Sequence, residues 1–426
     1  MRILRMFLVI AAVGAMQPLA ARAQESRGEL VNRLTSWMTI GAGSEAIGPD
    51  GQSPIPITGP PRWLSQDPYC AEDLYCENGQ CGYCNNCCRQ WDVFGSAEML
   101  LWWAKGNSLP PLLTTAPVDT VSPLPGALNQ DDTVVLFGNE IVGKNAQAGG
   151  RATVGIWLDP EHNVSLAARV FGLGGDENRF TANSTDFPFL LRPFIDGGTS
   201  ATFPIGFPGL VEGNFTAVSD NNNVFGVEAI SELMLQRDGN RRLDLVFGYQ
   251  LLRVDDSLSI NTTQILPDPA TIQTSDVFTA RNEFHGGTLG FHGRIARGVW
   301  SIDALGKVGI GSMRQRVQIS GETVFDDGVV TVLDRGFLAL PSNIGIYERN
   351  KFAFIPEATL NLKYHVSRNL NFHVGYNLLW ISHVATTGNL IDLNVDLSQA
   401  DPLPAFAFRD DDYWLQGINF GMNWDF

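Results

Sequence analysis

Large apolar and small polar side chains alternate through the last fourteen residues of the chain, 413–426. Trp414, Ile418, Phe420 and Met422 share one parity, and mostly glycines and asparagines occupy the other. Because the side chains of a β-strand alternate faces with a period of two, this pattern predicts a strand with one strongly apolar face. An aromatic face opposed by a polar face is typical of the wall of a membrane barrel.

Two further runs, 242–251 and 371–380, alternate in the same way over about ten residues each. Together these runs predict an all-β fold, a transmembrane antiparallel β-barrel over residues 91–426. Weaker alternating runs begin near Trp91, Gly150, Asn163, Asn223, Glu283, Val299 and Phe352.

Short turns and long polar stretches separate the predicted strands. Turns are predicted at 159–162, 237–240, 296–298 and 367–369. Extracellular loops are predicted at 106–149, 174–222, 255–281, 312–349 and 386–410. With both barrel ends in the periplasm, this alternation gives about ten strands. The run Glu212–Ser219 is interpreted as half of an extracellular hairpin, and counting it as a span gives about twelve strands instead.

The two ends of the chain predict export and membrane insertion. Arg2 and Arg5 precede a short apolar run, and Ala21-Arg22-Ala23 has the small-x-small pattern of a signal peptidase site, so residues 1–23 are predicted to be a signal peptide. No later stretch has the about 18 apolar residues of a transmembrane helix. The expected location is therefore the outer membrane. A sequence like the C-terminal insertion signal of bacterial outer-membrane barrels is formed by Asn419, Gly421, Trp424 and Phe426.

Residues 24–69 are predicted to be a flexible linker with a short amphipathic helix between Leu30 and Met38. Disulfides are the default state of the cysteine-rich segment 70–88 that follows, because the periplasm is oxidising. Its spacing also suits a metal site or bonds to a neighbouring protein, so the pairing stays open. The cysteines are Cys70, Cys76, Cys81, Cys84, Cys87 and Cys88.

If the strand positions that carry the aromatic residues face lipid, the alternate positions line the lumen. These lumen positions carry both acidic and basic residues. The interior of a barrel of about ten strands is largely filled by side chains, whereas open channels are typical of about 16 strands or more. The charges therefore predict either a structural salt-bridge network or a narrow conducting path. The candidate lumen residues are Glu98, Glu228, Glu232, Asp244, Asp303, Glu357, Arg151, Arg169, Arg242, Arg294, Lys307 and Lys363.

Composition excludes several other classes of function. The net charge of −16 leaves no basic stripe for nucleic acid. Acid pairs such as Asp255-Asp256 and Asp326-Asp327 are expected to be solvated loop residues, because none matches an EF-hand spacing, and no metal or cofactor is predicted. The six histidines lie in no recognisable catalytic constellation, so neither catalytic residues nor an enzymatic activity is predicted.

Six stretches carry a family resemblance: 97–106 (AEMLLWWAKG), 135–138 (VLFG), 149–160 (GGRATVGIWLDP), 207–213 (FPGLVEG), 282–290 (NEFHGGTLG) and 375–384 (GYNLLWISHV). Through them about three quarters of the chain resembles the BBP7 family of β-barrel porins, found mainly in planctomycete bacteria. The resemblance implies an outer-membrane barrel and no particular substrate. Thr386-Thr387-Gly388 stands where such proteins often have Arg-Pro-Gly.

The expected function is porin-like passive permeation of small polar solutes. The alternative is a closed structural barrel that anchors or presents loops for adhesion or envelope organisation. A continuous water-wide lumen would favour the first, and a chain of satisfied salt bridges would favour the second. The expected partners are outer-membrane lipid, the barrel-assembly machinery and a periplasmic protein that contacts the cysteine-rich segment.

Overall fold

The computed structural model describes residues 92–118, 124–267, 270–396, 402–409 and 411–425. The predicted signal peptide, linker helix and cysteine-rich segment, together with Trp91 and Phe426, lie outside these residues. In the described part of the chain, no helix has both the length and the apolar character needed to cross a membrane.

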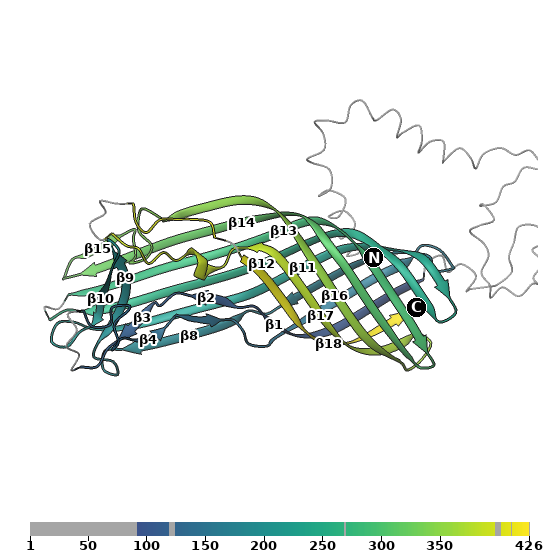
Figure 1. Ribbon diagram of the computed structural model, residues 1–426, viewed down its shortest axis with the longest axis horizontal. Coiled ribbons are helices and arrows are strands. Elements are labelled where there is room, and N and C mark those ends of the chain that lie inside the picture. The colour runs from purple at the N-terminus through teal and green to yellow at the C-terminus, as the bar shows by residue number, and fades with distance from the viewer. Residues whose placement is uncertain (1–91, 119–123, 268–269, 397–401, 410, 426) are drawn as a thin grey trace, which may run out of the picture. The chain divides into compact units, whose positions relative to one another are not determined.

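A closed ring of antiparallel strands forms the body of the described chain (Figure 1). Its sheet has twelve strands. One of them, β15 (Val330–Leu333), lies off the ring, and β7 and β8 both pair with β11, one after the other along its length, so the ring has ten positions. The ring confirms the predicted all-β fold with ten strands. Its strands are β1 (Val93–Ala104), β6 (Gln147–Trp157), β7 (Val164–Leu173), β8 (Asp176–Asn183), β11 (Glu212–Asp238), β12 (Arg241–Ile265), β13 (Thr271–Arg297), β14 (Trp300–Asp326), β16 (Gly345–His365), β17 (Leu370–Val384) and β18 (Asp411–Asp425).

Near the short turns, the ring is apolar outside and polar inside. On β14 the outward side chains of Trp300, Ile302 and Ile310 are about half exposed, whereas Ser301 and Asp303 face the lumen and are buried. Neighbouring strands repeat this alternation, because adjacent side chains of a strand point to opposite faces. We call this part of the ring the membrane section.

The two faces exchange character farther along the same strands. On β12 the outward residues change from apolar to charged between Leu251 and Arg253, while the lumen residues change from acidic Asp244 to buried Leu258 and Ile260. The exchange recurs on β13 and β14 at corresponding heights. Beyond it the ring is polar outside and apolar inside, which is the pattern of a water-soluble protein. We call this part the outer section.

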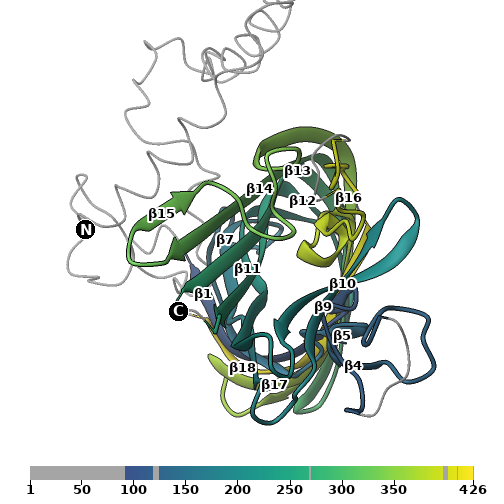
Figure 2. The same ribbon diagram turned by 90° about the vertical axis from the view of Figure 1, so that its left-hand side faces the viewer.

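Segments between the ring strands fill the outer section. One hydrophobic core joins lumen residues such as Phe278 and Val317 with Phe194 and Ile205 of a hairpin and with Leu390 of a short 3-10 helix. Figure 2 views the molecule from the end at which these segments lie. The elements outside the ring are β2 (Asn107–Leu109), β3 (Leu113–Thr115), β4 (Val134–Phe137), β5 (Glu140–Val142), β9 (Leu190–Asp196), β10 (Thr199–Gly206), β15 (Val330–Leu333) and the 3-10 helix Thr387–Leu390.

Much of the outer section was predicted as loops. The interpretation of 212–219 as half of an extracellular hairpin that is not part of a barrel span was wrong, because these residues begin the continuous strand β11. Likewise β12 runs on to Ile265, β13 starts at Thr271 and β14 ends at Asp326, so most of 255–281 and part of 312–349 are strand. The error has a physical cause: the exchange of faces makes these residues polar on the parity that is apolar in the membrane section.

Candidate functional site

The candidate site is the lumen of the membrane section, where all twelve charged residues predicted for the lumen lie on ring strands. Each takes part in an ion pair or a charge-assisted hydrogen bond, and the bonds divide them into three clusters. These are a central cluster, a cluster around Glu98 and a cluster toward the short turns.

The central cluster contains two acids and two bases from four strands. Lys307 on β14 lies 2.5 Å from both carboxylate oxygens of Glu228 on β11 and 3.1 Å from Glu357 on β16. Arg169 on β7 lies 3.4 Å from Glu228 and 3.3 Å from Glu357. The four formal charges therefore sum to zero. The side chains of Lys307 and Glu228 are each only 1% exposed, so two charges are withdrawn from water and depend on this pairing.

These bonds cross the lumen from wall to wall. β7 and β16 are five positions apart in a ring of ten, so Arg169 and Glu357 come from opposite walls. β11 and β14 are three positions apart, and Lys307 and Glu228 join them. The central cluster is therefore a bar across the barrel. An open aqueous channel would leave such wall residues exposed, which they are not.

The second cluster surrounds Glu98 on β1. Arg151 on β6 donates to both Glu98 oxygens at 2.5 and 3.1 Å, and Asn419 donates to one of them at 2.8 Å. Arg151 also donates to the Asn377 side chain at 3.1 Å, and His373 Nε2 lies 3.5 Å from Glu98. Asn377, Asn419 and His373 were not among the predicted lumen residues. Their shared parity with the polar face of 371–380 and 413–426 was the signal that could have identified them.

The third cluster lies toward the short turns. Asp303 binds Arg294 at 3.2 Å and also contacts Lys363 and His292. His292 Nδ1 lies 3.2 Å from Glu232. The last pair of this cluster lies beside them, because Arg242 donates to Asp244 at 2.8 Å.

A polar cavity of about 190 Å³ is lined by residues of the third cluster and also by Glu98, Arg151 and Arg169. Ligand atoms of Glu232, Asp244 and His292 lie within 4.8 Å of one another, a spacing that a divalent cation requires. Asp244 is already paired with Arg242, however, and Glu232 with His292. A cation would have to displace these partners, so the geometry suits a small polar solute better than a metal.

The outer section closes the lumen a second time. Arg192 on β9 donates to Asp276 on β13 at 2.7 Å, and both side chains are at most 1% exposed. The other Asp276 oxygen accepts the backbone N–H groups of Phe337, Leu338 and Ala339 at 2.8 to 2.9 Å. One carboxylate thus anchors two inserted segments, and the apolar core packs around them.

Asp256 is a second buried acid of the outer section, on β12 beyond the apolar outward band that ends at Leu251, so the expectation that it is a solvated loop residue was wrong. Burial raises its pKa to about 7. It accepts the backbone N–H of Asn222 at 2.9 Å, and Asn222 in turn accepts the hydroxyl of Tyr413. The second Asp256 oxygen has no hydrogen-bond partner among the described residues.

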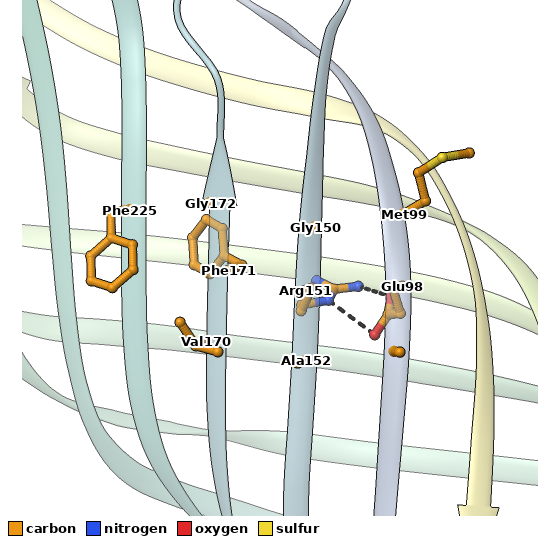
Figure 3. Close-up of a pocket in the computed structure, with 10 residues that line it drawn as sticks. Glu98, Met99, Gly150, Arg151, Ala152, Val170, Phe171, Gly172 and Phe225 are labelled. Atoms are coloured by element: carbon orange, nitrogen blue, oxygen red, sulfur yellow. Dashed lines mark hydrogen bonds and ion pairs between the residues drawn. The ribbon is translucent and has the colours of Figure 1, made fainter. Parts of the chain in front are cut away.

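A separate groove of about 430 Å³ lies on the outward face of β1, β6, β7 and β11 (Figure 3). Its floor consists of the small residues Gly150, Ala152 and Gly172, and Met99 and Phe225 are exposed at its edges. The groove is apolar and outward, so it belongs to the lipid-facing surface and not to the lumen.

Comparison with known proteins gives one family match. The family model described as "Putative beta barrel porin-7 (BBP7)" matches residues 94–426. No curated protein matches the chain. The outer membrane protease OmpT of Escherichia coli is 11% identical, with a TM-score of 0.40 over 79% of this chain and 97% of that chain. A Pseudomonas aeruginosa FadL homologue is 7% identical, with a TM-score of 0.22 over 79% of this chain and 90% of that one.

Proposed function

The chain belongs to the BBP7 family of β-barrel porins, and on that premise we propose that it is an outer-membrane barrel with a closed lumen that holds a rigid outer section at the cell surface. The apolar outward band of the membrane section supports the location, since a charged side chain on it would cost about 2 to 4 kcal/mol at mid-membrane. The exchange of faces supports the surface role, because the outer section has a polar exterior suited to water.

The main support for a closed lumen is the bar formed by four residues, Arg169, Glu228, Lys307 and Glu357. It joins opposite walls of the ring through ion pairs of 2.5 to 3.4 Å. The anchored outer section adds a second, independent closure. A pore requires a continuous aqueous path through the lumen, and two closures in series would interrupt that path twice. A structural barrel requires no such path.

The test is conductance of the refolded full chain in a planar bilayer, with heat-modifiable gel mobility to establish folding. Folded wild-type protein is expected to give no current steps. A variant in which Arg169, Glu228 and Lys307 are all alanine is also expected to stay silent, because the outer section still closes the lumen. Discrete, reproducible steps from folded wild-type protein would refute the proposal.

Passive permeation of small polar solutes is the second candidate function, and the family description and the polar cavity of about 190 Å³ favour it. It requires the bar and the outer core to open together. Current steps that appear only above a threshold voltage, and whose conductance Lys307→Met changes, would support permeation over the closed barrel.

A further inference from the structure

Four arginines gather on the outward face of the outer section, just beyond the apolar band. Arg253 lies on β12, Arg281 on β13, and Arg314 and Arg316 on β14. Their side chains are between 41 and 50% exposed. We call these four residues the guanidinium cluster. On β12 only one residue, which points inward, separates the cluster from Leu251 at the upper edge of the band.

Two members of the cluster face each other directly. Arg281 and Arg316 are cross-strand partners in the β13–β14 register. Like charges directly opposite one another destabilise a sheet, so this pair is unfavourable unless negative charge lies between the two groups.

Neighbouring acids relieve part of this repulsion, and Glu283, the cross-strand partner of both Arg253 and Arg314, is one of them. Arg281 Nε binds Asp255 at 3.0 Å, and Arg316 Nε lies 3.5 Å from Glu348. Within the part of the chain that the structure describes, the terminal nitrogens of both guanidinium groups make no hydrogen bond. The terminal N–H groups of Arg281 and Arg316 can therefore donate hydrogen bonds to one ligand on the surface.

The cluster is confined to one side of the ring. At the same end of the barrel on the far side, between β1 and β18, Lys105 is bound by Asp411 at 2.6 Å. The chain as a whole carries a net charge of −16, so a basic composition does not account for four arginines on three adjacent strands.

We propose that the guanidinium cluster binds the phosphate groups of lipid headgroups in the outer leaflet. Guanidinium forks match phosphate oxygens in geometry and charge, and paired forks can hold one phosphate between them. The adjoining apolar band would hold the acyl chains of the same molecule against Leu251 and Ile310. The proposal rests on the proposed membrane location, which places headgroups at the height of the cluster.

The test uses native mass spectrometry of the refolded full chain with bisphosphorylated lipid A as the probe. The variant Arg281→Gln/Arg316→Gln removes the facing pair and leaves the ion pairs of Arg253 with Asp255 and of Arg314 with Glu348. The control, Arg241→Gln/Arg297→Gln, removes two exposed arginines at the opposite end of β12 and β13. The Arg281/Arg316 variant is expected to bind about tenfold more weakly, which corresponds to about 1.4 kcal/mol. The control is expected to bind like wild type.

Three outcomes would overturn the proposal. These are equal lipid A binding by the Arg281/Arg316 variant, equal binding of fully dephosphorylated lipid A by wild type, and complete displacement of lipid A by inorganic phosphate, which would indicate a site for free anions. Flotation of the folded protein with vesicles tests the membrane location separately. Protein that stays out of vesicles but still binds lipid A through the cluster would refute only that location.

Discussion

Replacing Lys307 by Met should destabilise the barrel more than any other single change in the central cluster. Lys307 alone contacts both acids at 3.1 Å or less, and its side chain is 1% exposed. Its removal leaves Glu228 and Glu357 buried with only Arg169, at 3.3 to 3.4 Å, so the cluster changes from neutral to a net charge of −1. Breaking a buried pair from one side typically costs about 3 to 5 kcal/mol, and we expect a loss in this range.

The double variant Lys307→Met/Glu228→Gln separates this charge effect from a packing effect. It returns the cluster to neutrality with Arg169 and Glu357, so we expect it to recover all but about 1 to 2 kcal/mol. The exposed pair of Lys105 and Asp411 supplies a control, and Lys105→Met should cost less than about 1 kcal/mol. Free energies of unfolding are measured by urea titration of the protein in lipid vesicles. A loss below about 1 kcal/mol for Lys307→Met, or a double variant no better than the single one, would refute the reasoning.

Three further predictions concern the outer section. Asp256 has a folded pKa of about 7, above its ordinary value of 3.8, so its stabilising contribution is complete at low pH and is lost as the pH rises through about 7. Asp256→Asn should therefore leave the unfolding free energy unchanged near pH 3.5 and raise it by up to about 4 kcal/mol at pH 8, and equal shifts at both pH values would contradict this. Ile260→Asp puts a charge into the apolar core and should lower the unfolding free energy by more than about 3 kcal/mol. Its control Asn261→Asp, on the outward face, should change the unfolding free energy by about 0.5 kcal/mol or less. Similar losses for the two variants would disprove the exchange of faces. Asp276→Ala leaves Arg192 and three backbone N–H groups without their acceptor, so limited proteolysis should cleave within 334–344 much faster than in wild type, and an unchanged cleavage rate would argue against the anchoring role.

The membrane section could be predicted from the sequence because its physical rule is simple. Lipid requires an apolar outward parity, and runs such as 242–251 and 371–380 show that parity without interruption. The same rule predicted Glu228, Lys307 and the other candidate lumen charges by parity alone. It could not tell which charges meet, since Arg169 and Glu357 are brought together by ring closure and are 188 residues apart in the chain.

The outer section could not be predicted in the same way. Its strands keep the period of two, but the apolar parity moves to the inside, so a rule tuned to lipid interprets them as polar loops. The anchoring by Asp276 depends on contacts with Arg192 and Phe337, 84 and 61 residues away, which no local pattern encodes. The polar asparagines of 413–426 were seen in the sequence, yet their place beside Glu98 follows only from the pairing of β18 with β1.

The exchange of faces also bears on how deeply the protein lies in the bilayer. Two residues along a strand span about 7 Å. If the barrel sank by that distance, Arg253 would enter the edge of the hydrocarbon, where a charged side chain costs up to about 1 kcal/mol, and the cost would rise with depth as Arg281 and Arg314 followed. If it rose, Leu251 and Ile310 would leave lipid for water. The pattern of outward residues therefore favours one immersion depth, and with it one height of the outer section above the bilayer.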